Sequence, residues 1–435
     1  MSNKEIIQDI PKLLVLSNTC FSKSSANGRT LGNFLKGWPK EKIAQFFLSG
    51  NPDGEFCRSF YQITDGQAIK AFCFKKISNG TIKELDINNT SNGNVKVAKK
   101  INKNALTMLL REMIWSNRRW KKYGFEEWVD NFKPELLLLQ AGDSGFMCDL
   151  AVALSKKYNA PLVVYNSENY YFKGFDYFKS KGISHWMYPL FRKVFCRKFE
   201  RMIKASAHSI YLCEELKSVY DDAFHLPSSA IYTATDISVT ATEDNNRNEN
   251  EFIVSYLGNM GVGRADALCE FAQVLSTVST KASLDIYGKI PNDEVENKFA
   301  KEKNIRYKGF VQYDIVQKIM SESDLLIHVE SFEPFYKEDL KYAFSTKIAD
   351  SLVVGNCFLL YAPDSFACTK YLLNNEAAFV ATTKEQLSEY LKLIINNVEE
   401  RYRYKDNAQR LVANNHNLQK NAKLFQEILI NAYKQ

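Results

Sequence analysis

The chain lacks the features that mark several large classes of protein. None of the apolar runs in its 435 residues approaches the ~20 residues that a membrane-spanning helix needs. The first ten residues contain acids and no apolar core, so we expect no secretory signal peptide. The nine cysteines include no Cys-x-x-Cys pair, which argues against a zinc site or a disulfide framework. We therefore predict a protein of the reducing cytoplasm.

What the chain does contain is typical of large folded domains. Apolar residues make up 45% of the sequence and charged residues 25%, an ordinary balance for a protein with buried cores. The length fits roughly two to three domains. Residues 240–251 carry no large apolar side chain, so we predict a linker over 239–251.

Apolar runs of strand length alternate with helical patterns on both sides of this linker. The runs begin near residues 12, 42, 134, 161, 207, 252, 283, 305, 325 and 357. Such alternation is typical of parallel sheets with helices on both faces. We predict an α/β protein with two Rossmann-like, doubly wound domains, at 1–238 and 252–412, facing a central cleft. Residues 413–435 are predicted to form a helix that is able to pack back on the first domain.

Polar residues follow several strands of the first predicted domain. The carboxyl ends of parallel strands meet at one edge of a sheet, which brings Asn18, Asp143, Asn166 and Glu168 to the same edge. The stretch from 19 to 30, which includes Gly28, is rich in small residues and can bring backbone N–H groups to a ligand. It fits an ordinary turn equally well.

A glycine loop opens the second predicted domain. The strand that ends at Leu257 is followed by Gly258-x-x-Gly261-x-Gly263, and Arg264 then begins a helix. The dinucleotide fingerprint has the opposite glycine order and an acid at the end of the next strand, where this chain has Gly288-Lys289. A nicotinamide cofactor is therefore disfavoured, and the loop is suited instead to an approaching anion.

A second helix start carries a cation. A helix is expected between the strands Leu325–Val329 and Cys357–Tyr361, with Ser345 or Thr346 as its cap. Lys347 lies in its first turn, where the helix dipole disfavours positive charge by a few tenths of a kcal/mol. A solvent-facing lysine is the plainer interpretation, and a phosphate site is the functional one.

The two cations suggest one ligand. Arg264 and Lys347, each on the first turn of a helix, would bracket a diphosphate if both helices point at one crevice. Asp350 lies one turn deeper than Lys347, where a carboxylate is suited to accept hydrogen bonds from a ribose diol.

Two basic segments with interleaved aromatic residues, 111–122 and 186–204, have three interpretations. They can lie on an anionic membrane surface, form solvated faces of ordinary helices, or contact nucleic acid. No nucleic-acid-binding motif accompanies them, so we expect no nucleic-acid partner.

Five ordered blocks give the chain a family resemblance. They look like the C-terminal half of retaining GT-B glycosyltransferases of the group 1, or family 4, type. The blocks are Tyr256–Arg264, Ile286–Gly288, Tyr307–Val311, Asp324–Phe332 and Ser345–Gly355. The N-terminal half resembles the same fold more loosely, and a lysine-rich excursion over 77–103 is unmatched.

The resemblance assigns roles to residues of the second domain. Gly258-Asn259 stands where the family has Gly-Arg, and Arg264 stands where it has a phosphate-binding lysine, so Lys347 would supply the second cation. Counted back from Gly355, Asp350 takes the place of the acid that contacts ribose.

Other roles follow from the same resemblance. Glu330 or Glu333 would be the carboxylate that faces the donor sugar, displaced by an insertion over 334–344. Phe310 matches a position that lines the nucleobase pocket, and Asn166 with Glu168 occupies the neighbourhood of a histidine found in many relatives.

The resemblance implies metal-independent transfer with retention, from a UDP- or GDP-linked sugar to a glycan or lipid-linked saccharide, in cell-surface polysaccharide synthesis. It implies no cofactor, and it allows a peripheral position at the inner face of the cell membrane. The leaving diphosphate would accept the acceptor's proton while Arg264 and Lys347 stabilise its charge. Two alternatives remain open: a GT-B sugar-nucleotide epimerase and a non-catalytic GT-B subunit.

Overall fold

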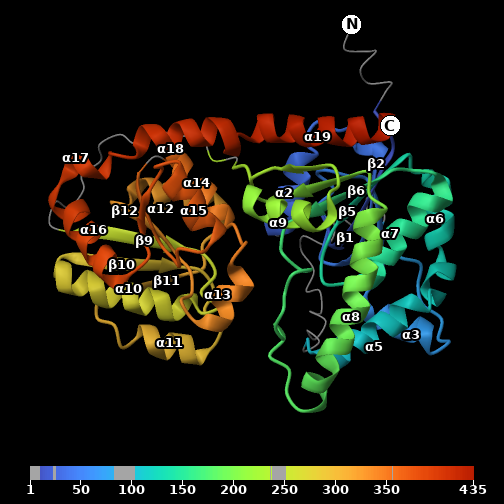
Figure 1. The fold of residues 1–435 in the computed structure, drawn as a ribbon, viewed down its shortest axis with the longest axis horizontal. Coiled ribbons are helices and arrows are strands. Elements are labelled where there is room, and N and C mark those ends of the chain that lie inside the picture. The colour runs from blue at the N-terminus through green and yellow to red at the C-terminus, as the bar shows by residue number, and fades with distance from the viewer. Residues whose placement is uncertain (1–9, 23–25, 83–102, 236, 238–250, 355) are drawn as a thin grey trace, which may run out of the picture. The chain divides into compact units, whose positions relative to one another are not determined.

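The computed structural model describes residues 10–22, 26–82, 103–235, 237, 251–354 and 356–435. The predicted linker at 239–251 except its last residue, most of the 77–103 excursion, and Gly355 lie outside these residues. The chain divides into two compact units, which Figure 1 shows in blue to green and in yellow to red. Unit 1 comprises Met1–Tyr232 and Gln419–Gln435, and unit 2 comprises Thr233–Leu418.

Unit 1 is built on an eight-stranded sheet in which only the short edge strand β4 runs antiparallel to its neighbour. In sheet order the strands are β4 (Thr81–Ile82), β3 (Ser59–Gln62), β2 (Ile43–Ser49), β1 (Leu13–Thr19), β5 (Leu136–Gln140), β6 (Leu162–Asn166), β7 (His208–Tyr211) and β8 (Ser228–Ala230). β5 and β6 are fully buried, and β1 is buried except at its last two residues, as expected for a parallel sheet covered on both faces.

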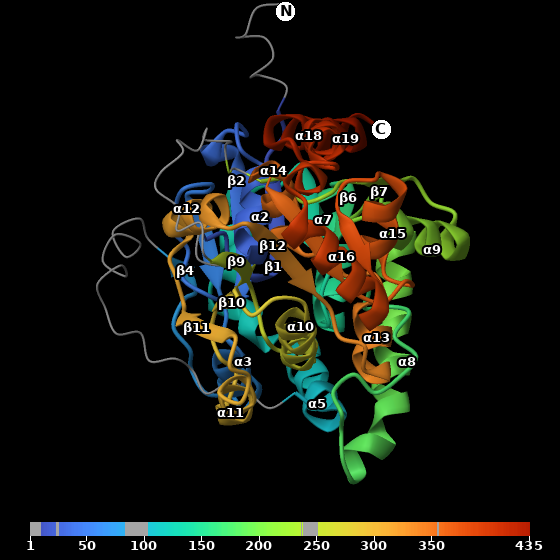
Figure 2. The ribbon, with the colours of Figure 1, turned by 90° about the vertical axis from the view of Figure 1, so that its left-hand side faces the viewer.

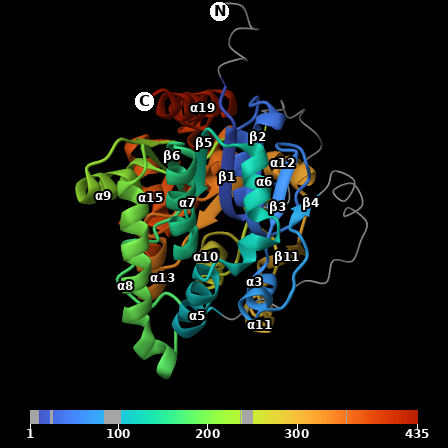
Figure 3. The same ribbon diagram turned by 90° about the vertical axis from the view of Figure 1, so that its right-hand side faces the viewer.

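Helices cover both faces of this sheet. They are α2 (Ala26–Phe34), η1 (Lys40–Lys42), α3 (Asp65–Phe72), α5 (Ala105–Ser116), η3 (Arg119–Tyr123), α6 (Phe125–Phe132), α7 (Gly145–Tyr158), α8 (Ile183–Lys204), α9 (Glu214–Phe224) and α19 (Leu418–Lys434). Figure 3 shows α7 and α8 side by side, in agreement with their close packing.

The C-terminal helix α19 contributes to the core of unit 1 although it ends the chain. Phe425, Ile428, Leu429 and Ala432 are spaced along one helical face and are buried. The ring of Phe425 stacks on Phe34 at 4.8 Å between centroids. The apolar periodicity of this helix therefore places it against residues that lie almost 400 positions earlier.

Unit 2 has a six-stranded, all-parallel sheet. The strands in order are β11 (Ile305–Gly309), β10 (Ala282–Tyr287), β9 (Phe252–Leu257), β12 (Leu325–Val329), β13 (Cys357–Tyr361) and β14 (Phe379–Ala381). Its helices are α10 (Arg264–Val278), α11 (Asp293–Phe299), α12 (Tyr313–Glu322), α13 (Pro334–Leu340), α14 (Thr346–Val354), α15 (Ala367–Asn374), α16 (Lys384–Asn396), α17 (Val398–Arg401), α18 (Lys405–Leu411) and the π-helical turn η4 (Val412–His416). In Figure 2, α10 and α16 lie in front of the strands.

The predicted fold class, an α/β protein with two Rossmann-like domains, is confirmed. β9, β12 and β13 begin and end at the predicted residues, because each is a buried apolar run. One detail is wrong. The predicted loop over 19–30 is already helical at Ala26, so Gly28 lies in α2. The predicted insertion over 334–344 contains the helix α13.

Candidate active site

The glycine loop of unit 2 is shaped by its own side chains. The Tyr256 hydroxyl donates to the carbonyl oxygen of Asn259 at 2.8 Å, and the Asn259 side chain accepts from the Gly261 N–H at 2.8 Å. Gly263 has φ +77°, and a Cβ there would lie 2.2 Å from the Ser331 hydroxyl. A side chain at 263 is therefore excluded, and the loop delivers the chain into α10 at a fixed angle.

Arg264, the first residue of α10, is held by a carboxylate of a neighbouring strand. Its Nε and Nη2 donate to the two Glu330 oxygens at 2.9 Å each. The Arg264 side chain is 12% exposed and that of Glu330 is 1% exposed. Such a two-point contact fixes the plane of the guanidinium, and it engages two of its five N–H donors.

Glu330 stays ionised in this environment. Burial raises the pKa of Glu330, but the charge of Arg264 and a hydrogen bond from His328 outweigh burial and lower the pKa to about 2. The His328 Nε2 lies 3.0 Å from Glu330 Oε1. Glu333, in contrast, is exposed and precedes α13. Glu330 is thus a buried partner of Arg264, and Glu333 is an exposed carboxylate.

The start of α14 carries the second predicted group of residues. Ser345, and not Thr346, provides the cap, because its Oγ accepts from the Lys347 N–H at 3.3 Å. The Lys347 ammonium lies 3.1 Å from Asp350 Oδ2. The Lys347 side chain is 24% exposed and that of Asp350 only 3%. Lys347 thus reaches solvent while Asp350 lies beneath it.

A buried histidine that sequence reasoning missed lies near Asp350. His416 is fully buried, with Nδ1 2.8 Å from the Thr233 carbonyl oxygen and Nε2 2.9 Å from the Tyr371 hydroxyl. Burial lowers the pKa of His416 to about 4, although the Thr233 carbonyl and the Asp350 charge favour the protonated form. His416 is therefore neutral at pH 7, with Nδ1 as the donor to Thr233.

The loops after β10 and β11 begin at the same sheet edge as the glycine loop after β9. A Cβ at Gly288 would lie 2.1 Å from the Gly258 carbonyl oxygen, so the loops after β9 and β10 touch through backbone alone. Phe310 follows β11 and is 59% exposed, with the Lys289 ammonium 4.8 Å from its ring. An exposed aromatic face at a strand end is able to stack on a planar ligand.

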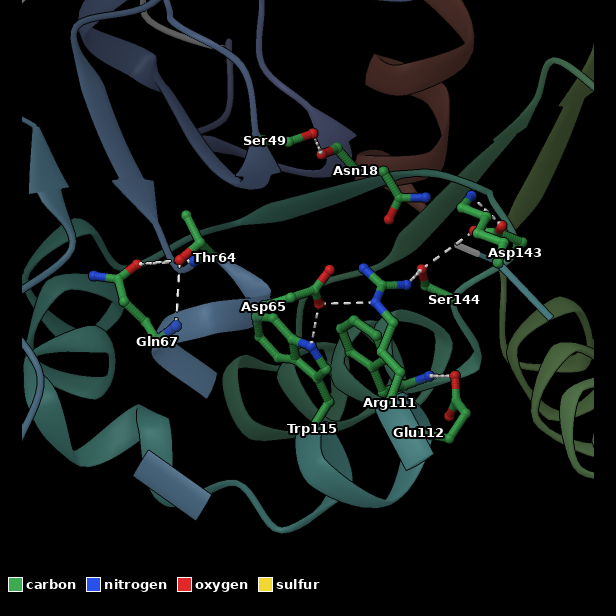
Figure 4. Close-up of polar contacts among 12 residues, drawn as sticks. Asn18, Ser49, Thr64, Asp65, Gln67, Arg111, Glu112, Trp115, Asp143 and Ser144 are labelled. Carbon is green, nitrogen blue, oxygen red and sulfur yellow. Dashed lines mark hydrogen bonds and ion pairs between the residues drawn. The ribbon is translucent and has the colours of Figure 1, made fainter. Parts of the chain in front are cut away.

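The corresponding edge of unit 1 has a different character. Asn18 is the penultimate residue of β1, and Asn166 is the last residue of β6. A Cβ at Gly142 would lie 2.4 Å from the Asn18 amide nitrogen. In Figure 4, Arg111 reaches from α5 to both Asp65 and Ser144. Its Nε lies 2.8 Å from Asp65 and its Nη1 lies 2.6 Å from Ser144.

A carboxylate fills the start of α7 in this unit. Glu112 Oε1 accepts from the Phe146 N–H at 3.1 Å, and Lys198 lies 3.0 Å from Oε2. Burial raises the pKa of Glu112 more than the charge of Lys198 lowers it. The N-terminus of α7 is therefore occupied by the protein's own anion.

Other residues of the unit 1 edge have clear placements. Asp143 is 2.6 Å from the Lys103 ammonium. Asn166 is 1% exposed, and neither polar atom of its side chain has a hydrogen-bond partner. Glu168 is exposed, two residues further on. Gly28 packs inside α2, where a Cβ would lie 2.3 Å from the Cys20 carbonyl oxygen. Its lack of a side chain thus serves close packing.

Sequence reasoning had no means to find several of these groups. Arg111 and Glu112 belong to a segment predicted to be a basic surface helix. His416 lies 66 residues after Asp350 and has no local pattern around it. Among the described residues, no group of three or more His, Cys, Asp or Glu side chains is arranged to hold a metal ion.

Comparison with known proteins points to one class. A family model described as glycosyl transferase-like matches residues 266–427, a segment that begins just after Arg264 and includes Lys347 and Asp350. The sequence matches no curated protein.

The whole chain resembles several solved structures. Anabaena HepE in complex with UDP superposes with a TM-score of 0.64 at 12% identity, covering 97% of this chain and 100% of that one. WaaG, a glycosyltransferase involved in lipopolysaccharide biosynthesis, gives 0.58 at 12% identity over 96% and 99%. A glycosyltransferase from Rickettsia africae gives 0.59 at 12% over 98% and 99%. The fold is thus the GT-B fold of glycosyltransferases.

Proposed function

We propose that the protein is a retaining, metal-independent glycosyltransferase. It would move a hexose-type sugar from a UDP- or GDP-linked donor to a glycan or lipid-linked saccharide in cell-surface polysaccharide synthesis. The observation that carries the proposal is the pair of cationic helix starts, Arg264 on α10 and Lys347 on α14. β9, which precedes α10, and β12, which precedes α13 and then α14, are neighbours in one parallel sheet. The match to a glycosyl transferase-like family model over residues 266–427, which include Lys347, supports it.

The two cations are suited to a diphosphate. Arg264 keeps three of its five N–H donors outside the contact with Glu330. The Lys347 side chain is partly exposed, with its ammonium 3.1 Å from Asp350. Both residues stand at helix N-termini, where the dipole favours negative charge. The complexes of Anabaena HepE contain UDP and UDP-glucose, which are ligands of the chemistry this site is proposed to take.

The remaining donor contacts follow from the same edge. Asp350 would accept hydrogen bonds from the ribose diol, and Phe310 would stack on the base. Ser345 and Thr346 at the α14 start, and Gly258 with Asn259 in the loop before α10, would present hydroxyl and backbone groups to the phosphates.

The carboxylates of the proposal divide by burial. Glu330 would act as a positioning residue for Arg264, because both its oxygens are engaged by Arg264. Glu333, which is exposed, would face the donor sugar. In unit 1, Gly28 remains a proposed contact of the donor, and Glu168 remains a proposed catalytic residue on the acceptor side.

In the proposed reaction the bond between the anomeric carbon and the diphosphate oxygen breaks, and the acceptor hydroxyl oxygen bonds to that carbon on the same face. The hydroxyl proton passes to the departing diphosphate oxygen. Arg264 and Lys347 stabilise the charge that develops there, and the loss of one such donor typically costs ~3–4 kcal/mol of barrier.

The proposed setting is the cytoplasmic face of the cell membrane, with no nucleic-acid partner. Within the described residues, no helix is long and apolar enough to cross a bilayer. Attachment would therefore be peripheral in this proposal.

A second candidate function is favoured by one observation. Both proposed phosphate cations already have carboxylate partners, Glu330 and Asp350, at 2.9 and 3.1 Å. A non-catalytic GT-B subunit that binds a glycan or a partner would show this feature with no turnover.

The test is turnover and thermal stabilisation with a panel of nucleotide sugars. We expect one donor to raise the melting temperature and to be hydrolysed slowly, and Lys347→Ala to reduce kcat/KM by about 10²–10³-fold. Lys370→Ala, an exposed lysine on α15, is the matched control and should leave turnover unchanged. Stabilisation without hydrolysis would favour the binding subunit, and conversion of the donor to its epimer would favour an epimerase. Equal turnover in both variants would exclude the assigned site.

A further inference from the structure

The first two turns of α8 expose large apolar side chains to solvent. Ile183, Trp186 and Leu190 are 75%, 84% and 48% exposed. Their spacing of three and four residues puts them on one face of the helix. The residues buried on the other side of α8 are Tyr188, Phe191, Phe195, Phe199, Met202 and Ile203. The helix thus has a core face and, at its start, a second apolar face that is exposed.

The start of α5 adds to this surface. Leu106, Leu110 and Met113 are 37%, 45% and 52% exposed and also share one helical face. Hydrogen bonds join the two helix starts: the Leu106 N–H donates to Ser184 Oγ at 3.2 Å and the Ala105 N–H donates to Ser180 Oγ at 3.3 Å. Figures 1 and 3 both show the start of α8 and α5 at the same, lower end of unit 1. We call the six exposed residues the apolar tip.

The apolar tip is a concentration rather than a scatter. Sixteen large apolar residues are exposed in the described part of the chain, and six of them lie in these two short segments. Single exposed apolar residues are normal, whereas a grouped patch marks an interaction site.

Positive charge surrounds the apolar tip. Residues 177–199 contain no acid and six basic residues. The exposed face of α8 continues from Leu190 through the exposed Lys193 and Arg197, at the same spacing of three and four. On α5 the one acid, Glu112, is buried against Lys198. The rim is therefore complementary to an anionic surface.

We propose that the apolar tip inserts into the interface of a bilayer that contains anionic lipids, with Lys193 and Arg197 meeting the headgroups. This inference rests on and sharpens the peripheral setting of the proposed function. Exposed apolar side chains beside a basic helix face are the composition of helices that lie in a membrane interface. Tryptophan at the edge of such a segment is typical of a membrane interface.

The structure narrows the surface predicted from sequence. Three residues of the basic segment 111–122 do not belong to this surface, because Trp115 and Trp120 are buried and Arg111 bonds Asp65 and Ser144. The aromatic residues of α8 beyond Leu190 belong to the core. A second copy of the chain is the poorer occupant, because a self-complementary contact would oppose the same cations.

Vesicle binding provides the test. The full-length protein is mixed with vesicles of phosphatidylcholine alone, or with 30% phosphatidylglycerol (about a third anionic, enough to attract basic segments). Trp186 is the reporter, because Trp38, Trp115 and Trp120 are buried and Trp128 is half-buried. We expect co-sedimentation with the anionic vesicles only, a blue shift of tryptophan emission, and quenching by brominated lipid.

Variants separate the apolar tip from the rest of the surface. Trp186→Ala with Leu190→Ser should weaken binding to the anionic vesicles by about tenfold or more, since each buried apolar side chain contributes over 1.4 kcal/mol. Val398→Ser with Tyr402→Ala, which removes exposed apolar residues of unit 2, is the matched control and should bind like the unmodified chain. Donor hydrolysis should be unchanged in both.

The outcomes are distinct. Equal vesicle binding by both double variants would overturn the inference, as would the absence of binding by the unmodified chain. A dimer in light scattering that dissociates in the Trp186→Ala, Leu190→Ser variant would assign the apolar tip to a second copy instead. Any of these results, obtained with donor hydrolysis intact, leaves the proposed transferase standing.

Discussion

The carboxyl edges of the two sheets have the same strand-to-helix arrangement but carry opposite charges at the helix starts. In unit 1 the helix that follows β5 receives a carboxylate of the protein itself, Glu112, at its first turn. In unit 2 the helices α10 and α14 begin with Arg264 and Lys347. A helix start already filled by an anion has little attraction for a phosphate, whereas one that carries a cation has more. The proposed function therefore assigns the donor diphosphate to unit 2.

The two edges also differ in how their buried carboxylates respond to protons. Burial raises the pKa of Glu112, and the Lys198 charge does not fully offset it. Glu330 is more deeply buried, yet the contact with Arg264 lowers its pKa to about 2. Geometry decides between these outcomes, since two matched hydrogen bonds stabilise the anion more than burial penalises it.

The largest expected effect concerns this pair of carboxylates. Glu330→Gln should lower the free energy of unfolding by ~3–5 kcal/mol, because Arg264 is left buried without a counter-charge. Glu112→Gln should change it by about 1 kcal/mol or less, because Lys198 keeps Asp149 at 2.9 Å. Urea unfolding of each variant at pH 7 measures both values.

The stabilising contributions of Glu330 and Glu112 should change with pH in opposite directions. The folded-state pKa of Glu330 lies below its usual value of 4.5, so its stabilisation is present above pH 4.5 and is lost as the pH falls toward 2. In Glu330→Gln that loss should disappear. Glu112 has a raised pKa, so its contribution is present at low pH and declines as the pH rises. Parallel profiles for the two variants would contradict the assignment.

The next largest effect compares two histidines. Burial lowers the pKa of His416 from 6.5 to about 4, so stability attributable to this residue is present above pH 6.5 and falls by about 3 kcal/mol as the pH drops to 4. In unit 1, His208 is less buried and its pKa is also lowered by burial. Between pH 7 and 4, the dependence of the melting temperature on pH should become much weaker in His416→Gln and only slightly weaker in His208→Gln.

How much of the fold and of the candidate site the sequence predicts depends on how far apart along the chain the interacting residues lie. β9, β12 and β13 are predictable because a buried strand appears in the sequence as a nearly continuous apolar run. The cationic helix starts are predictable because Arg264 and Lys347 lie in first turns, where the helix dipole disfavours positive charge. These signals need only neighbours along the chain.

The rest depends on long-range contacts. Arg264 and Glu330 are 66 residues apart, and nothing local marks the pair. Arg111 and Glu112 look like members of a surface helix, whereas packing turns them toward Asp65 and the α7 start. The sequence pattern of 186–204 similarly could not tell which aromatic residues face the core, because α8 has two apolar faces.

The smallest expected effect compares two aspartates. Asp350→Asn should raise the donor KM by about 10–100-fold with little change in kcat, since a charged hydrogen-bond partner contributes ~1.5–3 kcal/mol. Asp143→Asn, at the unit 1 edge, should leave the donor KM unchanged. Initial rates at fixed acceptor and varied donor measure both. A donor KM that responds to Asp143 and not to Asp350 would place the nucleotide in unit 1.

Hydrogen exchange with and without the nucleotide diphosphate tests most directly which edge holds the donor. The protein is exchanged alone, with UDP and with GDP, and peptides from the two edges are compared by mass. We predict slower exchange with one nucleotide in peptides that cover 257–265 and 345–351, and unchanged exchange in those that cover 103–116 and 141–148. Protection confined to the unit 1 peptides would contradict the assignment of the donor diphosphate to Arg264 and Lys347.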